Sequence, residues 1–408
     1  MTAAAFAQYI KEYELDAGVR TRVDCIEIDG IQVPLFSNEF WTSRQRQASS
    51  LHEISYRACF KPQLPRFFIE ALTAPGDLVY DPFAGRGTTV IEAGLLDRRV
   101  AANDVNPLSA LLARPRFFVP PIEAVAERLA SIPLTKGVRA EMDLSMFYHW
   151  RTEEEIAALR EYLLDREARG KEDRLDQWIR MLATNRLSGH SDGFFSVYTL
   201  PPNQAVTPER QIQINRRRNQ VPAYKEIVPR ILRKSAALVK NLTAAEISRL
   251  ARAGASAQFL CRDARFTPEI ADQSVKLTVT SPPFLDVVQY AKDNWLRCWF
   301  NGISAEAAGE RMTMAGSLEE WRQVMGDVFV ELYRITAPGG RVAFEVGEVR
   351  KGKVRLDEHT VPLGTKAGFR CEGILLNVQE FTKTANIWGI RNNDCGTNTN
   401  RIVLFCKD

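Results

Sequence analysis

The feature that most constrains the fold is a pattern at residues 78–107, LVYDPFAGRGTTVIEAGLLDRRVAANDVNP. An apolar run ends at Asp81, a turn containing Gly85 and Gly87 follows, and a helical stretch leads into a second apolar run. This order of strand, glycine-containing turn, helix and strand is typical of the beginning of a parallel α/β sheet. Open sheets of this kind bind ligands beyond the carboxyl ends of their strands.

The rest of the chain predicts further strands and a helical insertion. Strand-like text returns at 257–265, 275–284, 341–349 and 401–407, and a helix of roughly 16 residues within 317–336 ends in APGG, a helix stop signal. Before these strands, Thr152 to Glu155 has the pattern of a capping box at a helix start. We therefore expect a polar N-terminal arm (1–50), an α/β sheet (51–120 and 251–408), and a mainly helical insertion (121–250).

Composition excludes several classes of protein. The chain is 45% hydrophobic and 25% charged, as in soluble proteins with a sizeable core, and no apolar run approaches the length of a membrane-spanning helix. The N-terminus lacks the basic-then-apolar order of a secretory signal, so we expect a cytoplasmic protein without a membrane partner. Seven scattered cysteines and four histidines argue against a zinc centre or a disulfide framework. We expect no metal.

The glycine-containing turn favours a nucleoside ligand. Backbone N–H groups at such a turn can approach a ligand closely. A dinucleotide fingerprint needs a third glycine where Val90 stands, and the chain has no phosphate-binding Gly-Lys-Ser/Thr sequence here. Asp104, nineteen residues after Gly85, suits hydrogen bonding to both ribose hydroxyls. The alternative is a turn without a ligand and an aspartate that only caps it.

A second motif, Thr280-Ser-Pro-Pro-Phe, directly follows the apolar strand VKLTV. Pro283 keeps the Pro282 carbonyl out of a helical ladder, so this oxygen stays available as an acceptor. Ser281 supplies a second acceptor, and Phe284 supplies a flat stacking surface. These parts match the needs of an exocyclic amino group on a planar base. The alternative is a proline turn that merely closes a strand.

At this point the chain resembles a known family. DPFAGRGTT, NDVNP and TSPPF look like the motifs of the S-adenosylmethionine-dependent amino methyltransferases that modify DNA bases. HEISYRACFKPQLPRFFI resembles the family's upstream cofactor segment, RDAR its acidic turn beside adenine, and residues 382–405 its closing strands. The resemblance implies a Rossmann-like class I methyltransferase sheet, with the helical insertion between the cofactor and catalytic motifs.

The resemblance also implies site residues and a cofactor, S-adenosylmethionine. The implied cofactor-binding residues surround its methionine end, its ribose and its adenine, and are Asp81, Phe83, Gly85, Gly87, Asp104, Asp263 and Lys61. The implied catalytic residues are Ser281, Pro282, Pro283 and Phe284. No metal or covalent nucleophile is required, because the sulfonium already activates the methyl group.

The form Ser-Pro-Pro is similar to enzymes that methylate N4 of cytosine, whereas adenine-N6 enzymes more often have Asp or Asn in place of Ser281. Many N4 enzymes, however, place the catalytic motif before the cofactor motif, and this chain has the reverse order. The expected substrate is double-stranded DNA with its target base flipped out. The alternatives are an adenine-N6 DNA enzyme, an RNA amino-methyltransferase, and an inactive DNA-binding relative. A bacterial or archaeal cytosol and a companion restriction endonuclease fit this interpretation; the oligomeric state stays open.

A basic stretch in the insertion is the expected DNA contact. Lysine and arginine contacts to phosphate position a duplex, and aromatic residues lie nearby in the sequence. The expected residues are Arg216, Arg217, Arg218, Lys225, Arg233 and Lys234. The alternative is a solvated helix face.

Overall fold

The computed structural model describes residues 3–15, 20–41, 48–56, 59–135, 137–200, 205–283, 290–311, 316–349, 354–378 and 399–408. Its strands are β1 (Arg22–Ile28), β2 (Ile31–Asn38), β3 (Leu78–Asp81), β4 (Arg99–Asn103), β5 (Gln258–Leu260), β6 (Val275–Thr280), β7 (Thr336–Val346), β8 (Glu348–Val349), β9 (Val354–Arg355), β10 (Arg370–Val378) and β11 (Thr399–Cys406). Within these described ranges, one sheet has the order β1-β2-β10-β11-β7-β6-β3-β4-β5, and β8 pairs with β9 separately.

The centre of the sheet is parallel. Strands β5, β4, β3, β6 and β7 pair in parallel, and β11 runs antiparallel between β7 and β10. The core strands are apolar runs buried on both faces, as parallel strands require. The carboxyl ends of β3, β4, β5, β6 and β7 therefore meet at one edge of the sheet. The predicted class, a Rossmann-like α/β sheet with a helical insertion, is confirmed.

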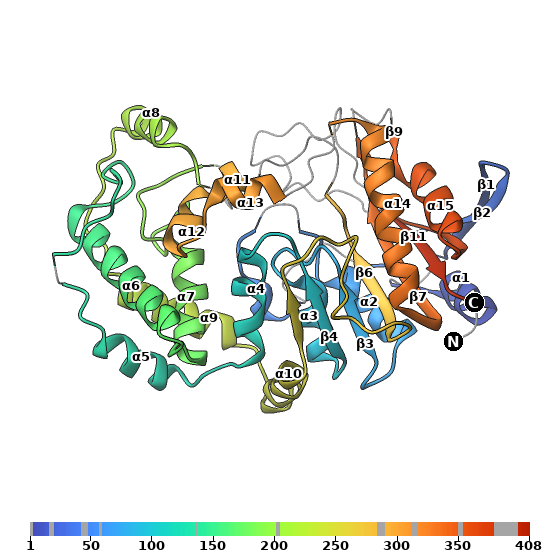
Figure 1. The fold of residues 1–408 in the computed structure, drawn as a ribbon, viewed down its shortest axis with the longest axis horizontal. Helices are drawn as coiled ribbons and strands as arrows, with labels where there is room; N and C mark the ends of the chain where they lie inside the picture. The colour runs from blue at the N-terminus through green and yellow to red at the C-terminus, as the bar shows by residue number, and fades with distance from the viewer. Residues whose placement is uncertain are drawn as a thin grey trace.

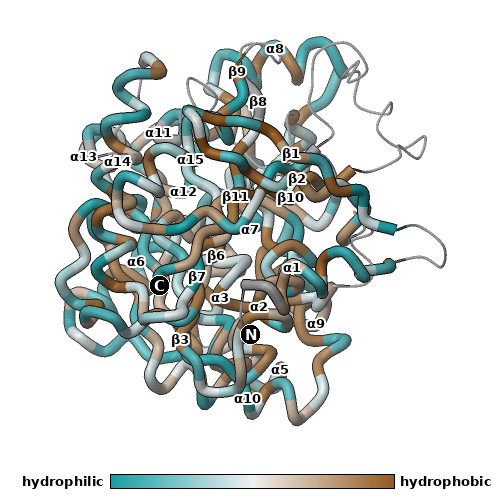
Figure 2. Tube along the Cα trace, turned by 90° about the vertical axis from the view of Figure 1, so that its right-hand side faces the viewer, coloured by the Kyte–Doolittle hydropathy of each residue, from teal (hydrophilic) through white to brown (hydrophobic). Residues whose placement is uncertain are grey.

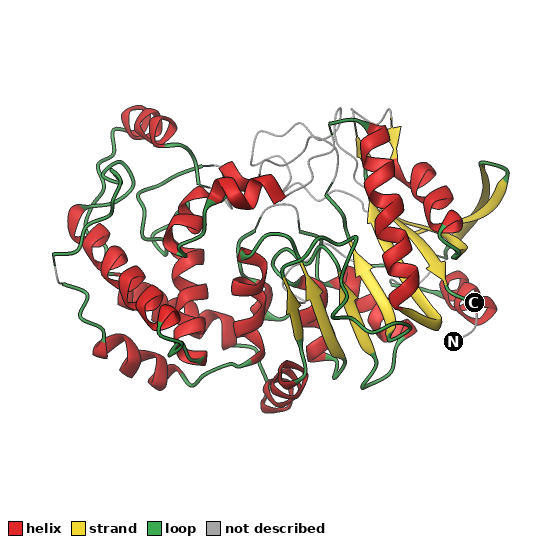
Figure 3. Ribbon diagram, in the orientation of Figure 1, coloured by secondary structure: helices red, strands yellow, loops and turns green. Residues whose placement is uncertain are grey.

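Helices cover both faces of this sheet, and others form a lobe beside it (Figure 3). They are α1 (Ala3–Glu12), η2 (Ser50–His52), α2 (Gln63–Leu72), α3 (Thr88–Leu95), α4 (Leu108–Ala113), η3 (Arg114–Phe117), α5 (Ile122–Ser131), α6 (Trp150–Ala168), α7 (Arg174–Arg186), α8 (Pro208–Arg218), α9 (Ile227–Val239), α10 (Ala244–Ala255), α11 (Tyr290–Asp293), α12 (Trp295–Phe300), α13 (Ala305–Arg311), α14 (Leu318–Ile335) and α15 (Leu356–Lys366). The helix expected within 317–336 is α14.

The core has two layers because successive side chains of a strand point to opposite faces. On β11, Ile402 and Leu404 join the cluster that contains α2 and α3, whereas Val403 and Phe405 join the cluster that contains α14 and α15. Figure 2 shows the hydrophobic part of the chain gathered in this interior, around β11, α2 and α3. None of the described helices combines the length and apolarity needed to cross a bilayer.

The helical segment that follows β4 forms a lobe beside the sheet (Figure 1). Its helices are joined by buried contacts, such as the hydrogen bond from Trp178 Nε1 to Ser235 Oγ (2.9 Å). Helix α12, which follows the Ser-Pro-Pro motif, packs against α7 of this lobe, and Asn301 donates to Thr184 Oγ1 (2.9 Å). Residues on both sides of the predicted 121–250 boundary therefore build the lobe.

The N-terminal segment differs from the expected polar arm. Strand β2 pairs in parallel with β10, and Phe6 and Ile10 of α1 are buried in the main core. The hairpin β1–β2 turns at Asp29 (φ 48°) and Gly30 (φ 77°), the Asp-Gly sequence that favours a tight hairpin turn. The described part of 1–50 is therefore an extension of the sheet. Its strands carry polar residues on their exposed side, and these mask the hairpin pattern in the sequence.

The capping box expected at Thr152 is also wrong. Helix α6 begins at Trp150, and His149 Nδ1 accepts the N–H of Arg151 (3.2 Å) as the cap. The hydroxyl of Thr152 instead exchanges hydrogen bonds with the backbone of Lys225, at 3.0 Å to its carbonyl and 2.8 Å from its N–H. The Thr152 side chain therefore forms a contact with a distant segment instead of the cap that the local sequence pattern predicted.

Candidate functional site

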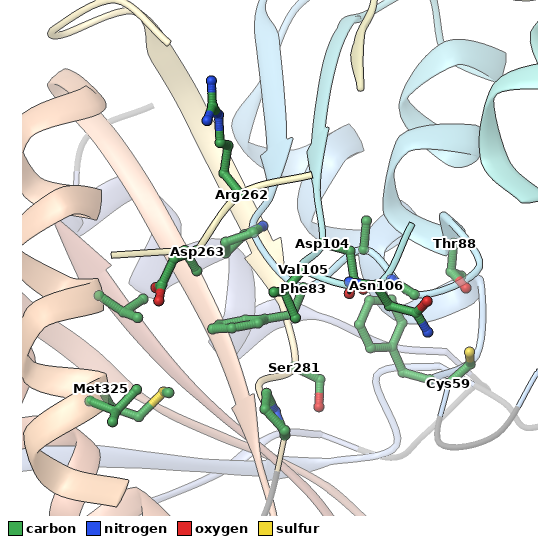
Figure 4. A pocket seen from close by; sticks show the side chains of 18 of the residues that line it. Cys59, Phe83, Thr88, Asp104, Val105, Asn106, Arg262, Asp263, Ser281 and Met325 are labelled. Carbon is green, nitrogen blue, oxygen red and sulfur yellow. Dashed lines mark hydrogen bonds between the residues drawn. The ribbon is translucent and has the colours of Figure 1, made fainter. Parts of the chain in front are cut away.

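A cavity lies beyond the carboxyl edge of the parallel strands (Figure 4). Its walls come from the turns after β3, β4, β5 and β6, from one side of α14, and from the segment around Tyr56. The residues implied by the sequence that line it are Phe83, Gly85, Asp104, Asp263, Ser281 and Pro283. The fold thus brings motifs separated by about half of the chain to one place.

Asp81 lies behind the cavity rather than in its wall. It is 1% exposed, and its Oδ1 accepts hydrogen bonds from Thr280 Oγ1 (2.6 Å) and the Phe83 N–H (3.1 Å). Burial raises the pKa of Asp81 to about 7, although these hydrogen bonds act in the opposite direction. Asp81 therefore ties the glycine-containing turn to the residue just before Ser281.

The two glycines have different roles. Gly85 (φ 51°) lines the cavity, and its N–H donates to Asp104 Oδ2 (2.8 Å). Gly87 (φ 80°) is outside the lining and precedes α3, where an added Cβ would lie 2.7 Å from the Cβ of Ala113. Its positive φ and this close approach both require glycine. Gly87 therefore has a structural role in the turn, and its cofactor contact stays a prediction.

Asp104 has the geometry expected of a hydroxyl-binding acid. Its two oxygens accept the N–H groups of Gly85 (2.8 Å) and Asn106 (2.9 Å), which fixes the carboxylate in the cavity wall. Burial raises its pKa to about 6, and the two N–H groups partly offset that effect. A carboxylate has about four acceptor sites, so two remain for ligand hydroxyls.

Asp263 and Lys61 have contrasting positions. Asp263 lines the cavity, and Arg265 holds its carboxylate by two hydrogen bonds, at 3.0 Å and 2.6 Å, which lower its pKa. In Figure 4 the neighbouring Arg262 side chain points away from the cavity. Lys61 is outside the lining, and burial and the charge of Arg86 lower its pKa.

In the Ser-Pro-Pro motif the carbonyls of Pro282 and Pro283 differ in their contacts with the described residues. Trp321 Nε1 donates to the Pro283 carbonyl (3.1 Å) and so fixes the turn. The Pro282 carbonyl accepts no hydrogen bond from the residues that the structure describes. Phe284, the expected stacking residue, lies outside the described residues.

A buried carboxyl that the sequence analysis missed lies beside Ser281. Glu345, at the end of β7, is 9% exposed and hydrogen-bonds with the side chains of Ser281 and Asn400. Burial raises its pKa to about 7, against the effect of both hydrogen bonds. The sequence could have indicated this residue, because Glu345 is the one charged residue between Arg341 and Gly347 in an otherwise apolar strand.

Other lining residues were not named individually, although some of them lie in the segment 52–69 that resembles the family's upstream cofactor segment. Tyr56 accepts a hydrogen bond from Asn106 Nδ2 (3.1 Å) and packs over Gly85. Further lining residues are Cys59 and Phe60, from the segment around Tyr56, and Val324, Met325 and Val328 of α14, whose helical spacing is typical of core residues.

The residues expected to contact DNA do not share one environment. Arg216, Arg217 and Arg218 are exposed at the end of α8, and Arg233 is also exposed. Lys225, by contrast, donates to the carbonyls of Phe194 (3.3 Å) and Ser196 (2.7 Å) and so anchors a loop. Lys234 is 9% exposed and lies 3.7 Å from Glu53. Among the described residues, no group of three or more His, Cys, Asp or Glu is arranged to hold a metal ion.

Comparison with known proteins gives a match over part of the chain. Residues 34–114 match the family model described as DNA methylase, and this region contains the glycine-containing turn and Asp104. No curated protein matches the chain.

Solved structures give partial and distant matches. A Thermus thermophilus protein provisionally assigned as a DNA modification methylase is 23% identical over 36% of this chain and 50% of that one, with a TM-score of 0.21. A TehB-like SAM-dependent methyltransferase of Corynebacterium glutamicum is 8% identical over 84% and 87% (TM-score 0.30). An rRNA methyltransferase of Streptomyces viridochromogenes is 12% identical over 90% and 95% (TM-score 0.34). At these scores the matches say nothing about the reaction.

Proposed function

We propose that this protein is an S-adenosylmethionine-dependent DNA methyltransferase that acts on the N4 amine of cytosine. The observation that carries the proposal is the shared cavity, which Gly85, Asp104, Asp263 and Ser281 all line. The match of residues 34–114 to a DNA methylase model supports DNA as the substrate.

The residues present fit the cofactor. The fixed carboxylate of Asp104 has free acceptor sites for two ribose hydroxyls, Phe83 offers an apolar face, and Asp263 can accept from an amino group. When bound, S-adenosylmethionine supplies a methyl group that its sulfonium has already activated. The protein must therefore supply alignment and charge stabilisation rather than a nucleophile.

Ser281 and Pro282 hold the amine. The Pro282 carbonyl, which has no donor among the described residues, and Ser281 Oγ accept the two amino N–H groups of the base. These hydrogen bonds direct the nitrogen lone pair toward the methyl group and stabilise the positive charge that develops on nitrogen. Trp321 holds the adjacent Pro283 carbonyl and thereby fixes the orientation of the free one.

Glu345 receives the proton. As the nitrogen–methyl bond forms and the sulfur–methyl bond breaks, the amine must lose one proton to become neutral. That proton passes to Ser281 Oγ while the serine proton passes to the Glu345 carboxylate, with which Ser281 is hydrogen-bonded. A carboxyl with a pKa of about 7 is suited to accept a proton near neutral pH.

The test is transfer of a labelled methyl group. Purified protein and tritiated S-adenosylmethionine are incubated in two parallel reactions, one with unmethylated genomic DNA and one with total RNA. We expect label in duplex DNA, and none with the matched variant Ser281→Ala. Label in RNA alone, or in neither substrate, contradicts the proposal.

A further inference from the structure

A group of cations lies where the helical lobe meets the segment that forms the cavity wall. Arg186 ends α7, Arg297 belongs to α12, and Lys234 belongs to α9. Arg297 donates to the Ser55 carbonyl, Lys234 lies beside Glu53, and the charge of Glu53 also acts on Arg186. Residues 53–55 lead directly to Tyr56 in the wall of the cavity. We call Arg186, Arg297 and Lys234 the seam cations. They connect three elements of the lobe to the site.

The two seam arginines are held by neutral groups. Arg297 donates to Asn294 Oδ1 (3.0 Å) and to the Ser55 carbonyl (3.0 Å). Arg186 donates to the carbonyl (3.1 Å) and to Oδ1 (2.8 Å) of Asn185. In the described part of the chain, neither guanidinium forms an ion pair with a carboxylate.

One carboxylate serves the whole neighbourhood. Glu53 lies 3.7 Å from the Lys234 ammonium and 3.5 Å from that of Lys240, and its side chain is 49% exposed. Among the described residues, two arginines and two lysines thus share one solvent-exposed negative charge. The seam carries a local excess of positive charge although the chain as a whole carries only +4.

This excess is costly without an anion. Burial and repulsion by Arg297 lower the pKa of Arg186 to about 10, and burial and repulsion by Arg186 lower that of Lys234 to about 8. Buried charges are normally paired, because desolvation without a counter-charge is unfavourable. Arg186 Nη1 donates to no atom of the described residues, while stacking of the guanidinium on Phe194 (4.0 Å) fixes its plane.

We propose that the seam cations bind one backbone phosphate of the DNA, beside the nucleotide that enters the cavity. The inference rests on the proposed function. A phosphate fits because the planar guanidinium donates pairs of hydrogen bonds to its oxygens. Segment 53–56 connects the seam to the cavity wall, so a phosphate held here is joined to that wall by one short segment of chain. The bound anion also links the lobe to the sheet.

The exposed arginines of α8 are the competing location. Arg216, Arg217 and Arg218 lie at the C-terminal end of α8, and Figure 1 shows α8 at the outer end of the lobe. Arg218 stacks on Tyr198 (3.8 Å). Because these arginines are solvated, they carry no desolvation cost that a phosphate would remove.

The first experiment is the salt dependence of DNA binding, measured by fluorescence anisotropy with a labelled duplex. Each lost phosphate contact makes the slope of log affinity against log salt shallower by about 1. We expect this change in Arg186→Ala, and none in the control Arg252→Ala, whose exposed side chain pairs with Asp97 (2.8 Å) on the sheet side. Cofactor affinity, measured by calorimetry, should stay unchanged in both variants.

A duplex with single neutral methylphosphonate linkages then locates the phosphate. One linkage next to the methylated base should weaken binding of the wild type and leave Arg186→Ala unaffected. The proposal is overturned if Arg186→Ala lowers only the melting temperature, or if Arg217→Ala rather than Arg186→Ala changes the slope. If the wild type methylates no nucleic acid but the slope still depends on Arg186, the proposed function fails and the phosphate site stands.

Discussion

Replacement of Glu345 by glutamine tests the proposed path of the proton. Glutamine keeps the size of the side chain and its hydrogen bond with Ser281, but it cannot take up a proton. General base catalysis contributes about 10²–10⁴-fold to a rate. We therefore expect the single-turnover methylation rate of Glu345→Gln to fall by that factor, with little change in cofactor or DNA affinity.

The pH dependence gives a sharper signature than the rate alone. With a pKa of about 7, half of Glu345 is ionised at pH 7 and roughly one tenth at pH 6. The wild-type rate should rise about tenfold from pH 5 to 6, less steeply through 7, and level off above 8. The variant should show no such rise.

A stability measurement separates this role from a structural one. Because the folded pKa lies above the ordinary value of 4.5, the folded protein binds a proton more tightly than the unfolded chain. The contribution of Glu345 to stability should therefore fall by roughly 3 kcal/mol as the pH rises from about 4.5 to 7 and be constant above, in addition to the losses from the similarly buried Asp81 and Asp104. Glu345→Gln should lack this loss. A variant with the wild-type rate and the wild-type pH profile would refute the reasoning.

Three further predictions concern the same pocket. Asp104→Asn should weaken S-adenosylmethionine binding by about 100-fold, because hydrogen bonds to a charged group contribute about 1.5–3 kcal/mol each. The wild-type affinity, measured by calorimetry, should fall as the pH drops through about 6, because Asp104 is then protonated. Equal affinity at pH 5 and 8 would contradict this assignment. Ser281→Ala should bind cofactor and DNA normally in titrations but lose most of the methylation rate; full activity would exclude its role. Gly87→Ala should lower the free energy of unfolding, measured by urea denaturation, by about 1–3 kcal/mol or more. The reasons are the φ of 80° at this position and the 2.7 Å distance from the added Cβ to the Cβ of Ala113. Gly76→Ala, with φ 85° and no neighbour within 4 Å, is the control, and an equal loss in both would show that the contact is unimportant.

The sequence predicts the site best where a motif directly follows a strand. Parallel pairing aligns the ends of β3, β4 and β6, so Gly85, Asp104 and Ser281 meet once the strands are recognised. Glu345 could not be placed this way. Its position depends on the register of β7 against β6, in which Phe344 pairs with Thr280, and no local pattern encodes that register.

The basic residues were harder to interpret because charge alone does not show which face of a helix is exposed. Helical spacing carries the missing information for Lys234, which lies on the same stripe as the buried Ile227, Ile231 and Leu238 of α9. For Lys225 the deciding contact is with a distant loop. The sequence therefore indicates that the lobe is basic, but only the packing shows which cations are exposed.

The most direct test of the central claim is the identity of the methylated base. Unmethylated duplex DNA is incubated with pure protein and S-adenosylmethionine that carries a deuterated methyl group, then digested to nucleosides and analysed by mass spectrometry. The account predicts labelled N4-methylcytosine, formed by the wild type and absent with Ser281→Ala. Labelled N6-methyladenine would contradict the proposed role of Ser281 in selecting cytosine, and DNA without any labelled base would contradict the proposed function.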